Sequence, residues 1–377
     1  MRKFVRYSLS LALLGVATAS NAQSSVTLYG LLDTGLVYTS NSAGHSNYQQ
    51  ASGILAGSRW GLVGTEDLGG GLKAIFRLEN GFNLSNGQLG QNGRMFGRTA
   101  FVGLSDSRFG TITLGRQYLT TIDYVGPLTL SWIGGAAHPY NNDNVNNAFL
   151  SNNAVKYQSV NYNGFRFGGL YGFSNEAGGF ADGSAYSVGA SYASGGLTVA
   201  ANYFQLNNPG TTTNPGGAVA TGDAIFYAAR QRSWGAGANY AFGAATAGLV
   251  FTQTQLSNAT AIGASSAGTS SNLKLTSSNA RFTNYELNGR YILTPEWTLA
   301  AAYVLTDARL DGASPKYHQV TVEVYYALSK RTNLFLDTAF QHVTNTGTSG
   351  ITAHIPGVSA SSTSSQLMVG LGIQHRF

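Results

Sequence analysis

The sequence QLMVGLGIQHRF, residues 366–377, ends the chain with a regular alternation. Apolar side chains occupy every second position from Leu367 to Ile373, which is the period of a β-strand with two different faces. The last residue, Phe377, is aromatic, although chain ends are usually polar and frayed. The pattern therefore predicts a terminal strand whose end is held in place by pairing with another strand.

The composition of the chain is unusual for a soluble globular protein. Charged residues make up 10% of the 377 residues, whereas roughly 25% is typical of soluble domains. No run of 18 apolar residues is present, so the sequence contains no candidate for a membrane-spanning helix. The chain has 49 glycines and no cysteine, so disulfides cannot stabilise it. A closed sheet, in which every strand is hydrogen-bonded on both sides, would provide the stability instead.

Residues 1–22 have the features of a cleaved export signal. Three basic residues are followed by an apolar stretch too short to span a bilayer and by a small-residue cleavage site that ends at Ala22. Removing the three basic residues lowers the formal net charge from +6 to +3. A nearly balanced chain does not support a nucleic-acid-binding surface. We expect residues 23–377 to form a single exported domain.

Alternating segments fill the rest of the chain. Sixteen of them, each of about 8 to 14 residues, match the length of tilted membrane strands. They begin near residues 25, 54, 72, 97, 109, 153, 164, 184, 196, 233, 245, 281, 296, 316, 332 and 366. Seven short turns alternate with eight long connections, which cover about residues 40–53, 84–96, 119–152, 175–183, 207–232, 256–280, 310–315 and 346–365. This sorting is typical of outer-membrane barrels, which have short periplasmic turns and long external loops.

The two faces of each segment differ in polarity. Val322 and Val324 alternate with Glu323, and Leu336 is followed by Asp337. Parity alone does not tell a membrane barrel from a soluble β-sandwich or barrel with an apolar interior. The export signal, the scarcity of charge and the Tyr and Phe residues near strand ends favour lipid outside and water inside. We therefore expect an all-β fold, a transmembrane antiparallel sixteen-stranded β-barrel.

Several segments, in order along the chain, resemble the general Gram-negative porins, and most of all the β-proteobacterial trimeric sixteen-stranded porins. They are SSVTLYGLLDTGLVY, SRWGLVGTEDLGGGLKAIFRLENGF, GRTAFVGLSDSRFGTITLGRQY, NNAVKYQS and the terminal GIQHRF. The resemblance covers essentially the whole chain after the export signal. It implies a homotrimer in the cell outer membrane, in contact with outer-membrane lipid and lipopolysaccharide. It also implies that the third long loop, about residues 119–152, folds into the barrel and narrows it.

The resemblance assigns candidate residues to the narrowest part of the pore. Arg59 and Arg98 match wall arginines of the constriction in that family, and Arg77 shares their lumen-facing parity. Arg116 is a further candidate, although apolar Leu114 has the same parity; a contact of the second long loop at a subunit interface is the alternative. Each arginine could also be a solvated lumen charge or pair with a nearby acid.

The third long loop carries few charges. Between Gln117 and Val155 they are Asp123 and Asp143 alone, and Lys156, just beyond, has lumen parity. The chain lacks a loop acid and, near Leu150, an arginine that similar porins often carry. We expect Asp123, Asp143 and Lys156 to contribute to the constriction, with an arginine-rich wall facing a poorly acidic loop.

These features predict passive diffusion of small hydrophilic solutes and inorganic anions through a water-filled pore, with a modest anion preference and no cofactor. A substrate-specific channel, for example for sugars, is the main alternative. Its aromatic track would use Tyr118, Tyr124, Trp132 and Tyr140, although such rings more commonly pack a loop against the wall. Exposure of the loops as an adhesin or surface antigen would be a secondary consequence of the same architecture.

An enzyme is the other alternative. The six histidines are scattered, and the chain has neither H-E-x-x-H spacing nor a G-x-S-x-G elbow. They are His45, His138, His318, His342, His354 and His375. We therefore expect no catalytic centre and no metal site, and treat an outer-membrane hydrolase with a Ser and His pair as the remaining enzymatic possibility.

Overall fold

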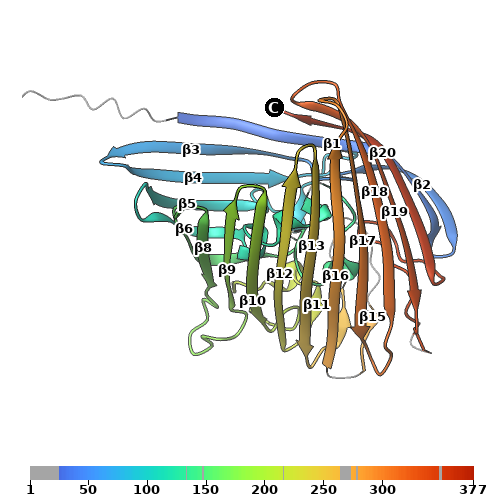
Figure 1. The fold of residues 1–377 in the computed structure, drawn as a ribbon. Coiled ribbons are helices and arrows are strands. Elements are labelled where there is room, and N and C mark those ends of the chain that lie inside the picture. The colour runs from blue at the N-terminus through green and yellow to red at the C-terminus, as the bar shows by residue number, and fades with distance from the viewer. Residues whose placement is uncertain are drawn as a thin grey trace, which may run out of the picture.

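The computed structural model describes residues 25–132, 134–146, 148–214, 216–263, 273–276, 279–347 and 350–377. The expected export signal lies outside the described residues. Seventeen of the strands form one antiparallel sheet that closes on itself (Figure 1). These strands are β1 (Ser25–Ser42), β2 (His45–Ser52), β3 (Arg59–Gly69), β4 (Leu72–Gly81), β5 (Thr99–Asp106), β6 (Gly110–Tyr118), β7 (Leu150–Gln158), β8 (Phe165–Gly172), β9 (Ala185–Ser194), β10 (Leu197–Asn207), β12 (Arg230–Phe242), β13 (Ala245–Ser257), β16 (Asn279–Ile292), β17 (Trp297–Arg309), β18 (Lys316–Ala327), β19 (Thr332–Thr344) and β20 (Ser365–Arg376).

The remaining elements are short and lie in the long connections. They are β11 (Phe226–Tyr227), β14 (Ala261–Ile262), β15 (Leu273–Lys274), α1 (Gly90–Gly93), η1 (Thr120–Ile122), η2 (Gly126–Leu128), η3 (Leu130–Trp132), η4 (Pro139–Asn141) and η5 (Thr221–Asp223). In the described part of the chain, no helix has the length and apolar character needed to cross a membrane.

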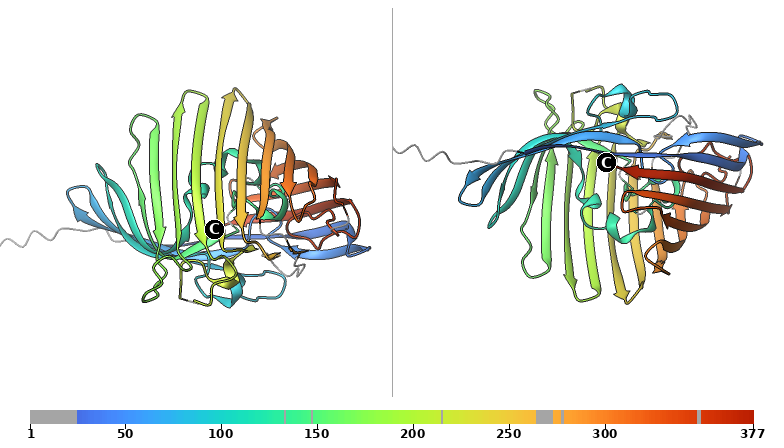
Figure 2. Two further views of the ribbon diagram at one scale, coloured as in Figure 1. Left: turned by 90° about the horizontal axis from the view of Figure 1, so that it is seen from below. Right: turned by 90° about the horizontal axis from the view of Figure 1, so that it is seen from above.

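The barrel has sixteen wall positions because β2 and β3 share one of them. The first half of β1 pairs with β3, the second half pairs with β2, and β20 lies on the other side of β1. Every other strand of the wall pairs with its neighbours in chain order (Figures 1 and 2). The predicted all-β sixteen-stranded barrel is confirmed.

The first long connection differs from the sequence prediction. The sequence predicts a loop at 40–53, but β1 continues to Ser42 and β2 returns from His45. The turn between them uses Ala43 and Gly44 at positive φ values of 53° and 103°, as a tight two-residue hairpin requires. Tyr38 and Tyr48 lie opposite each other, and their ring centroids are 4.9 Å apart. The prediction was wrong because β2 is polar on both faces, so hydrophobic alternation does not mark it.

The end of the chain is part of the wall. β20 pairs with β1 from Leu31 opposite Arg376 to Thr39 opposite Met368. Beyond β20, the backbone N–H of Phe377 donates to the carbonyl of Gly30, and the N–H of Gly30 donates to the carbonyl of Phe377, both at 3.1 Å. No free edge remains at this seam, so the aromatic terminus is fixed by hydrogen bonds, as the terminal alternation predicts.

We expect Gly30→Ala to weaken this seam. A Cβ atom at position 30 would lie 2.3 Å from Cζ of Phe377 and 2.8 Å from the carbonyl oxygen of Arg59. Because the Arg59 carbonyl belongs to the paired backbone, relief requires a shift of the strands, at a cost of about 1–3 kcal/mol. The measurement is the urea concentration at which half of the protein is unfolded, read from the gel band of the folded form, which shifts on heating. Gly169→Ala is the matched control, since its nearest atoms are 3.6 Å away; equal midpoints for the two variants would contradict the prediction.

The two faces of the wall have opposite polarity. Large apolar side chains such as Leu36, Leu287 and Leu371 are 57–67% exposed on the outer face. Glu323 and Asp337, on the alternate parity, are buried on the inner side at 0% and 1%. Apolar residues therefore face outward, as the membrane assignment requires.

Candidate functional site: the barrel interior and loop 3

The third long loop, called loop 3 here, lies inside the ring of strands in its described residues, 119–132, 134–146, 148 and 149 (Figures 1 and 2). Its short helical turns contact β8, β9 and β10 through η1, β12 and β13 through η2, and β17 through η3. Tyr124, Val125 and Leu128 pack with Val250 of the wall, and Leu130 packs with alanines of β17. Loop 3 thus crosses the interior along one part of the wall, in agreement with the expected inward fold.

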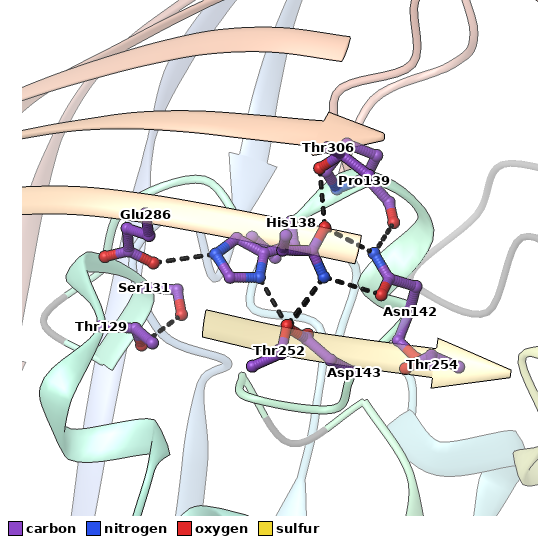
Figure 3. Close-up of polar contacts among 12 residues, drawn as sticks. Thr129, Ser131, His138, Pro139, Asn142, Asp143, Thr252, Thr254, Glu286 and Thr306 are labelled. Carbon is purple, nitrogen blue, oxygen red and sulfur yellow. Dashed lines mark hydrogen bonds and ion pairs between the residues drawn. The ribbon is translucent and has the colours of Figure 1, made fainter. Parts of the chain in front are cut away.

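A buried ionic network fastens loop 3 to the wall (Figure 3). His138 lies between two carboxylates: Nδ1 is 2.6 Å from Oδ2 of Asp143, and Nε2 is 2.8 Å from Oε2 of Glu286. Glu286 projects from β16 and also accepts the backbone N–H of Leu130 at 2.7 Å. All three ionisable side chains are 1–2% exposed. We call His138, Asp143 and Glu286 the loop latch.

The latch depends on a charged imidazole. Burial by itself lowers the pKa of His138, but the charge of Asp143 and hydrogen bonds to both carboxylates outweigh it and raise the pKa to about 10. Burial likewise opposes ionisation of Asp143, and the charge of His138 reverses the effect, so the pKa of Asp143 lies below its ordinary value. At neutral pH the histidine is therefore a cation between two acids.

Asp143 consequently does not line an open constriction, contrary to the sequence expectation. Besides His138, its Oδ2 accepts hydrogen bonds from Thr252 of β13 and from Asn284 of β16, the latter at 3.2 Å. The sequence could not reveal this, because a loop has no side-chain parity and Glu286 lies 148 residues from His138. Neither His138 nor Glu286 is among the site residues that the sequence predicts.

Asp123, the other loop acid, is also paired. Its Oδ2 lies 2.6 Å from Nζ of Lys156 on β7, and its Oδ1 accepts a hydrogen bond from Gln158 at 3.1 Å. Lys156 also donates to the carbonyl of Tyr118 at 3.0 Å. The two predicted residues Asp123 and Lys156 are therefore brought together, and they tie the start of loop 3 to the wall. Neither acid of loop 3 is left as a free carboxylate.

Arginines gather on a different part of the wall, on β3, β4 and the residue preceding β5. Nε of Arg98 lies 2.7 Å from Oε1 of Glu79, and Arg59 interacts electrostatically with both of them. The guanidinium of Arg77 lies over the ring of Tyr29, 5.7 Å from its centroid. We call Arg59, Arg77 and Arg98 the wall arginines; the structure brings these three predicted residues together.

Glu79 is the carboxylate at the centre of this group. It accepts a hydrogen bond from Tyr29 at 2.7 Å and one from Tyr118 at 3.4 Å, in addition to the ion pair with Arg98. Among the described residues, neither Arg59 nor Arg77 forms an ion pair. Three guanidinium charges minus one carboxylate charge leave a local net charge of +2. The inner surface here is electropositive.

Arg116 is placed elsewhere, contrary to its assignment to the constriction. On β6, Arg116 lies opposite Ala100 of β5. Two residues earlier on the same face of the strand, Leu114 lies opposite Val102, and both of these side chains are exposed on the outer face. Its Nη1 and Nη2 contact the carboxylate of Asp223 at 2.9 and 3.2 Å. Asp223 also pairs with Arg94 of the second long loop at 2.6 Å. Arg116 and Asp223 therefore join two long loops of the same chain to each other and to β6.

The four aromatic residues considered for a sugar track each contact a different part of the barrel interior. Tyr124 is buried against the wall, Tyr118 contacts Glu79, and Tyr140 packs between Phe282 and Tyr317. Trp132 remains half exposed. Packing of the loop accounts for most of these rings.

Comparison with known proteins agrees with this architecture. A family model described as Gram-negative porin matches residues 9–348.

The chain belongs to the Gram-negative porin family.

This porin is 31% identical to an outer membrane porin protein of Bordetella pertussis, over 97% of each chain. It is also 31% identical to outer membrane porin protein 32 of Delftia acidovorans, over 98% of its own length and 99% of that protein. Among solved structures it is similar to the anion-selective porin from Comamonas acidovorans, with a TM-score of 0.74 and 27% identity, covering 94% of this chain and 100% of that one. Fold and family together place this porin in the outer membrane.

Proposed function

We propose that this porin forms a water-filled channel for passive diffusion of small hydrophilic solutes, with a modest preference for anions. The carrying observation is the charge of the inner wall on β3, β4 and the start of β5, where the wall arginines outnumber Glu79. Asp123 and Asp143 of loop 3 are each paired with a cation. Fixed charges along a pore set which ion enters at lower cost. Arginine is always charged and weakly hydrated, so small anions pass such a wall without tight binding.

The proposal has support from the similar porin of Comamonas acidovorans, which is described as anion-selective. The constriction role rests on Arg59, Arg77 and Arg98; Asp123 and Lys156 would act by positioning loop 3. No cofactor takes part, and nothing is consumed.

Single-channel recording tests the proposal. In a planar bilayer with unequal potassium chloride on the two sides, we expect ohmic current steps. The reversal potential should have the sign expected when chloride is more permeant than potassium. A reversal potential of the opposite sign, with potassium more permeant than chloride, would refute the anion preference. Conductance that one sugar blocks at low concentration would instead support the substrate-specific channel.

A hydrolase has one observation in its favour. Nδ1 of His342 lies 2.7 Å from Oγ of Ser365 on the neighbouring strand. A Ser–His pair needs a third group that orients the imidazole, and in the described part of the chain no carboxylate contacts His342. Absence of current together with ester hydrolysis lost in Ser365→Ala would favour the enzyme.

The assembly and its surroundings are also proposals. A homotrimer is supported by the strongly apolar outer face of β1 and β5, where Val26, Leu28 and Val102 are 58–64% exposed. We further propose that residues 1–22 are the cleaved export signal, that 23–377 form one domain, and that outer-membrane lipid, including lipopolysaccharide, surrounds the rest of the barrel. Mass measurement of the protein in nanodiscs distinguishes a trimer from a monomer.

A further inference from the structure

Two of the six histidines are brought together on the outer face of the barrel. His318 of β18 lies directly opposite His342 of β19 in the strand register. Their chain neighbours Gln319 and Gln341, which have the other parity, are fully buried on the inner side, whereas both histidines are half-buried. His318 and His342 therefore project outward from adjacent strands of the wall (Figure 1). We call these two residues the histidine pair.

The spacing of the pair suits two imidazoles that share one ion. Residues directly opposite each other on antiparallel strands have Cβ atoms about 4.5–5.5 Å apart. An imidazole nitrogen lies about 2.0–2.1 Å from a bound zinc ion, so two such nitrogens on the same ion are about 3–4 Å apart. Two rings on facing positions reach this separation without any change in the strand register.

Hydrogen bonds orient both rings. Nδ1 of His318 lies 2.7 Å from the hydroxyl oxygen of Tyr303 on β17, and Nδ1 of His342 lies 2.7 Å from Oγ of Ser365 on β20. The strands follow one another in the wall as β17, β18, β19 and β20. Each hydrogen bond therefore turns the Nδ1 side of its ring away from the other histidine.

The second nitrogen of each ring is left for a ligand. A hydroxyl can accept a hydrogen bond from Nδ1–H, and the neutral imidazole then carries its free lone pair on Nε2. Within the part of the chain that the structure describes, neither Nε2 has a hydrogen-bond or ion-pair partner. Histidines that bind metals usually donate their other ring N–H to a neighbouring polar group, which fixes the tautomer and the ring orientation. Both rings of the pair have this arrangement.

The pair lies where the apolar outer face ends. Toward the short turns, Val320 and Phe340 follow on the same face and are each 45% exposed. Toward the long loops, Lys316 lies opposite Thr344 on one side and opposite Asp307 on the other. The charges of Lys316 and Asp307 are opposite, so the nearest ionisable groups on this face do not repel a cation. An ion can reach the pair from the medium at this boundary.

The donor atoms select the class of ion. Imidazole nitrogen suits zinc, copper and nickel, whereas calcium and magnesium take oxygen ligands. In the described residues, no group of three or more His, Cys, Asp or Glu side chains is placed to hold a metal ion. A site at the pair therefore has two protein ligands, and water supplies the others.

We propose that the histidine pair binds a divalent transition-metal ion, Zn²⁺ or Cu²⁺, through Nε2 of each ring. Tyr303 and Ser365 are positioning residues, because they hold the imidazoles in the tautomer that binds metal. This role explains the contact between His342 and Ser365 without a catalytic carboxylate. The site lies on the outer face, so it is independent of the ion selectivity of the lumen.

The test is a calorimetric titration of purified full-length protein in detergent, first freed of metal with a chelator. Zn²⁺ should bind the wild type saturably, Cu²⁺ should bind more tightly, and Ca²⁺ should not bind. His318→Gln/His342→Gln should lose the saturable binding. The control is His45→Gln/His375→Gln, which removes an exposed and a half-buried histidine from other parts of the barrel and should bind Zn²⁺ like the wild type.

Two further sets of variants separate a shared site from independent surface histidines. His318→Gln and His342→Gln should each lose the saturable binding as fully as the double variant, because one imidazole cannot chelate. Tyr303→Phe/Ser365→Ala keeps both ligands and should bind Zn²⁺ about tenfold or more weakly, because the rings are no longer oriented. Saturating Zn²⁺ should also raise the urea concentration at half-unfolding of the wild type, and leave that of the double glutamine variant unchanged.

Three results would overturn the proposal: wild-type Zn²⁺ affinity in the double glutamine variant, half of the binding capacity retained by each single variant, or Ca²⁺ binding as tight as that of Zn²⁺. Wild-type affinity in Tyr303→Phe/Ser365→Ala would remove the positioning role. The gel band of the folded form, which shifts on heating, shows that each variant is folded. Reversal potentials of the histidine variants should equal that of the wild type, which keeps this test separate from that of the anion preference.

Discussion

Reversing the charge of Arg59 and Arg77 is expected to turn an anion-preferring channel into one that prefers cations. These two wall arginines form no ion pair within the described residues, so their charges act on passing ions. Two unit charges about 4 Å apart in water interact by about 1 kcal/mol, which corresponds to a roughly fivefold change in permeability for each ion. Arg59→Glu/Arg77→Glu replaces a local net charge of +2 by −2, and so acts on anions and cations in opposite directions.

The measurement is the reversal potential in unequal potassium chloride, with Arg59→Gln/Arg77→Gln as an intermediate step. Arg108→Glu is the control for a charge reversal outside the constriction, because Arg108 is exposed at a short turn and pairs with Asp106 at 3.3 Å. Glu79→Arg/Arg98→Glu exchanges the buried ion pair without changing the net charge and should retain the anion preference. If the double glutamate variant keeps the wild-type reversal potential, the wall arginines do not set selectivity.

Breaking the loop latch is expected to widen the pore. In His138→Leu, Asp143 and Glu286 remain buried without their cation, and removing one partner from a buried ionic group costs about 3–5 kcal/mol. The least costly relief is detachment of loop 3 from β13 and β16, which exposes both carboxylates to water. We expect larger and noisier single-channel currents and faster uptake of oligosaccharides in liposome-swelling assays.

A neutral network provides the control for this experiment. In His138→Gln/Asp143→Asn/Glu286→Gln every side chain can still form hydrogen bonds, so the loop should stay closer to its wild-type position and the conductance should change less. Equal conductance of His138→Leu and wild type, with both barrels folded, would show that the latch does not hold loop 3.

The same network predicts how the pore responds to pH. His138 has a pKa raised from 6.5 to about 10, so its contribution to stability is complete below about pH 6.5 and is lost as the pH rises through about 10. Asp143 has a lowered pKa, so its contribution is present above the ordinary value of 3.8 and is lost in acid. Current noise should therefore increase at both extremes in the wild type. The variant His138→Gln/Asp143→Asn/Glu286→Gln should remove this pH dependence of the noise. An unchanged pH profile in that variant would show that other groups cause the dependence.

Local patterns were sufficient for much of the fold. Hydrophobic alternation is a property of neighbouring residues, so it marked the sixteen wall positions, separated short turns from long loops and predicted that Phe377 closes the barrel. It failed for β2, whose residues are polar on both faces and whose strand conformation depends on pairing with β1. The resemblance to porins then identified the wall arginines Arg59 and Arg98, and parity added Arg77.

Other parts of the site depend on contacts between distant residues. Asp143 and Arg116 were expected in the constriction. Their partners Thr252 and Asp223, however, lie 109 and 107 residues away from them along the chain. Likewise, Arg232, Arg281 and Arg309 lie in one line only through the register of β12, β13, β16 and β17. The sequence by itself determined which face of each strand is polar, because side chains alternate strictly along extended backbone. Only the tertiary structure decided which charges are neutralised, because a charge's free energy depends on what lies within a few ångströms of it in space.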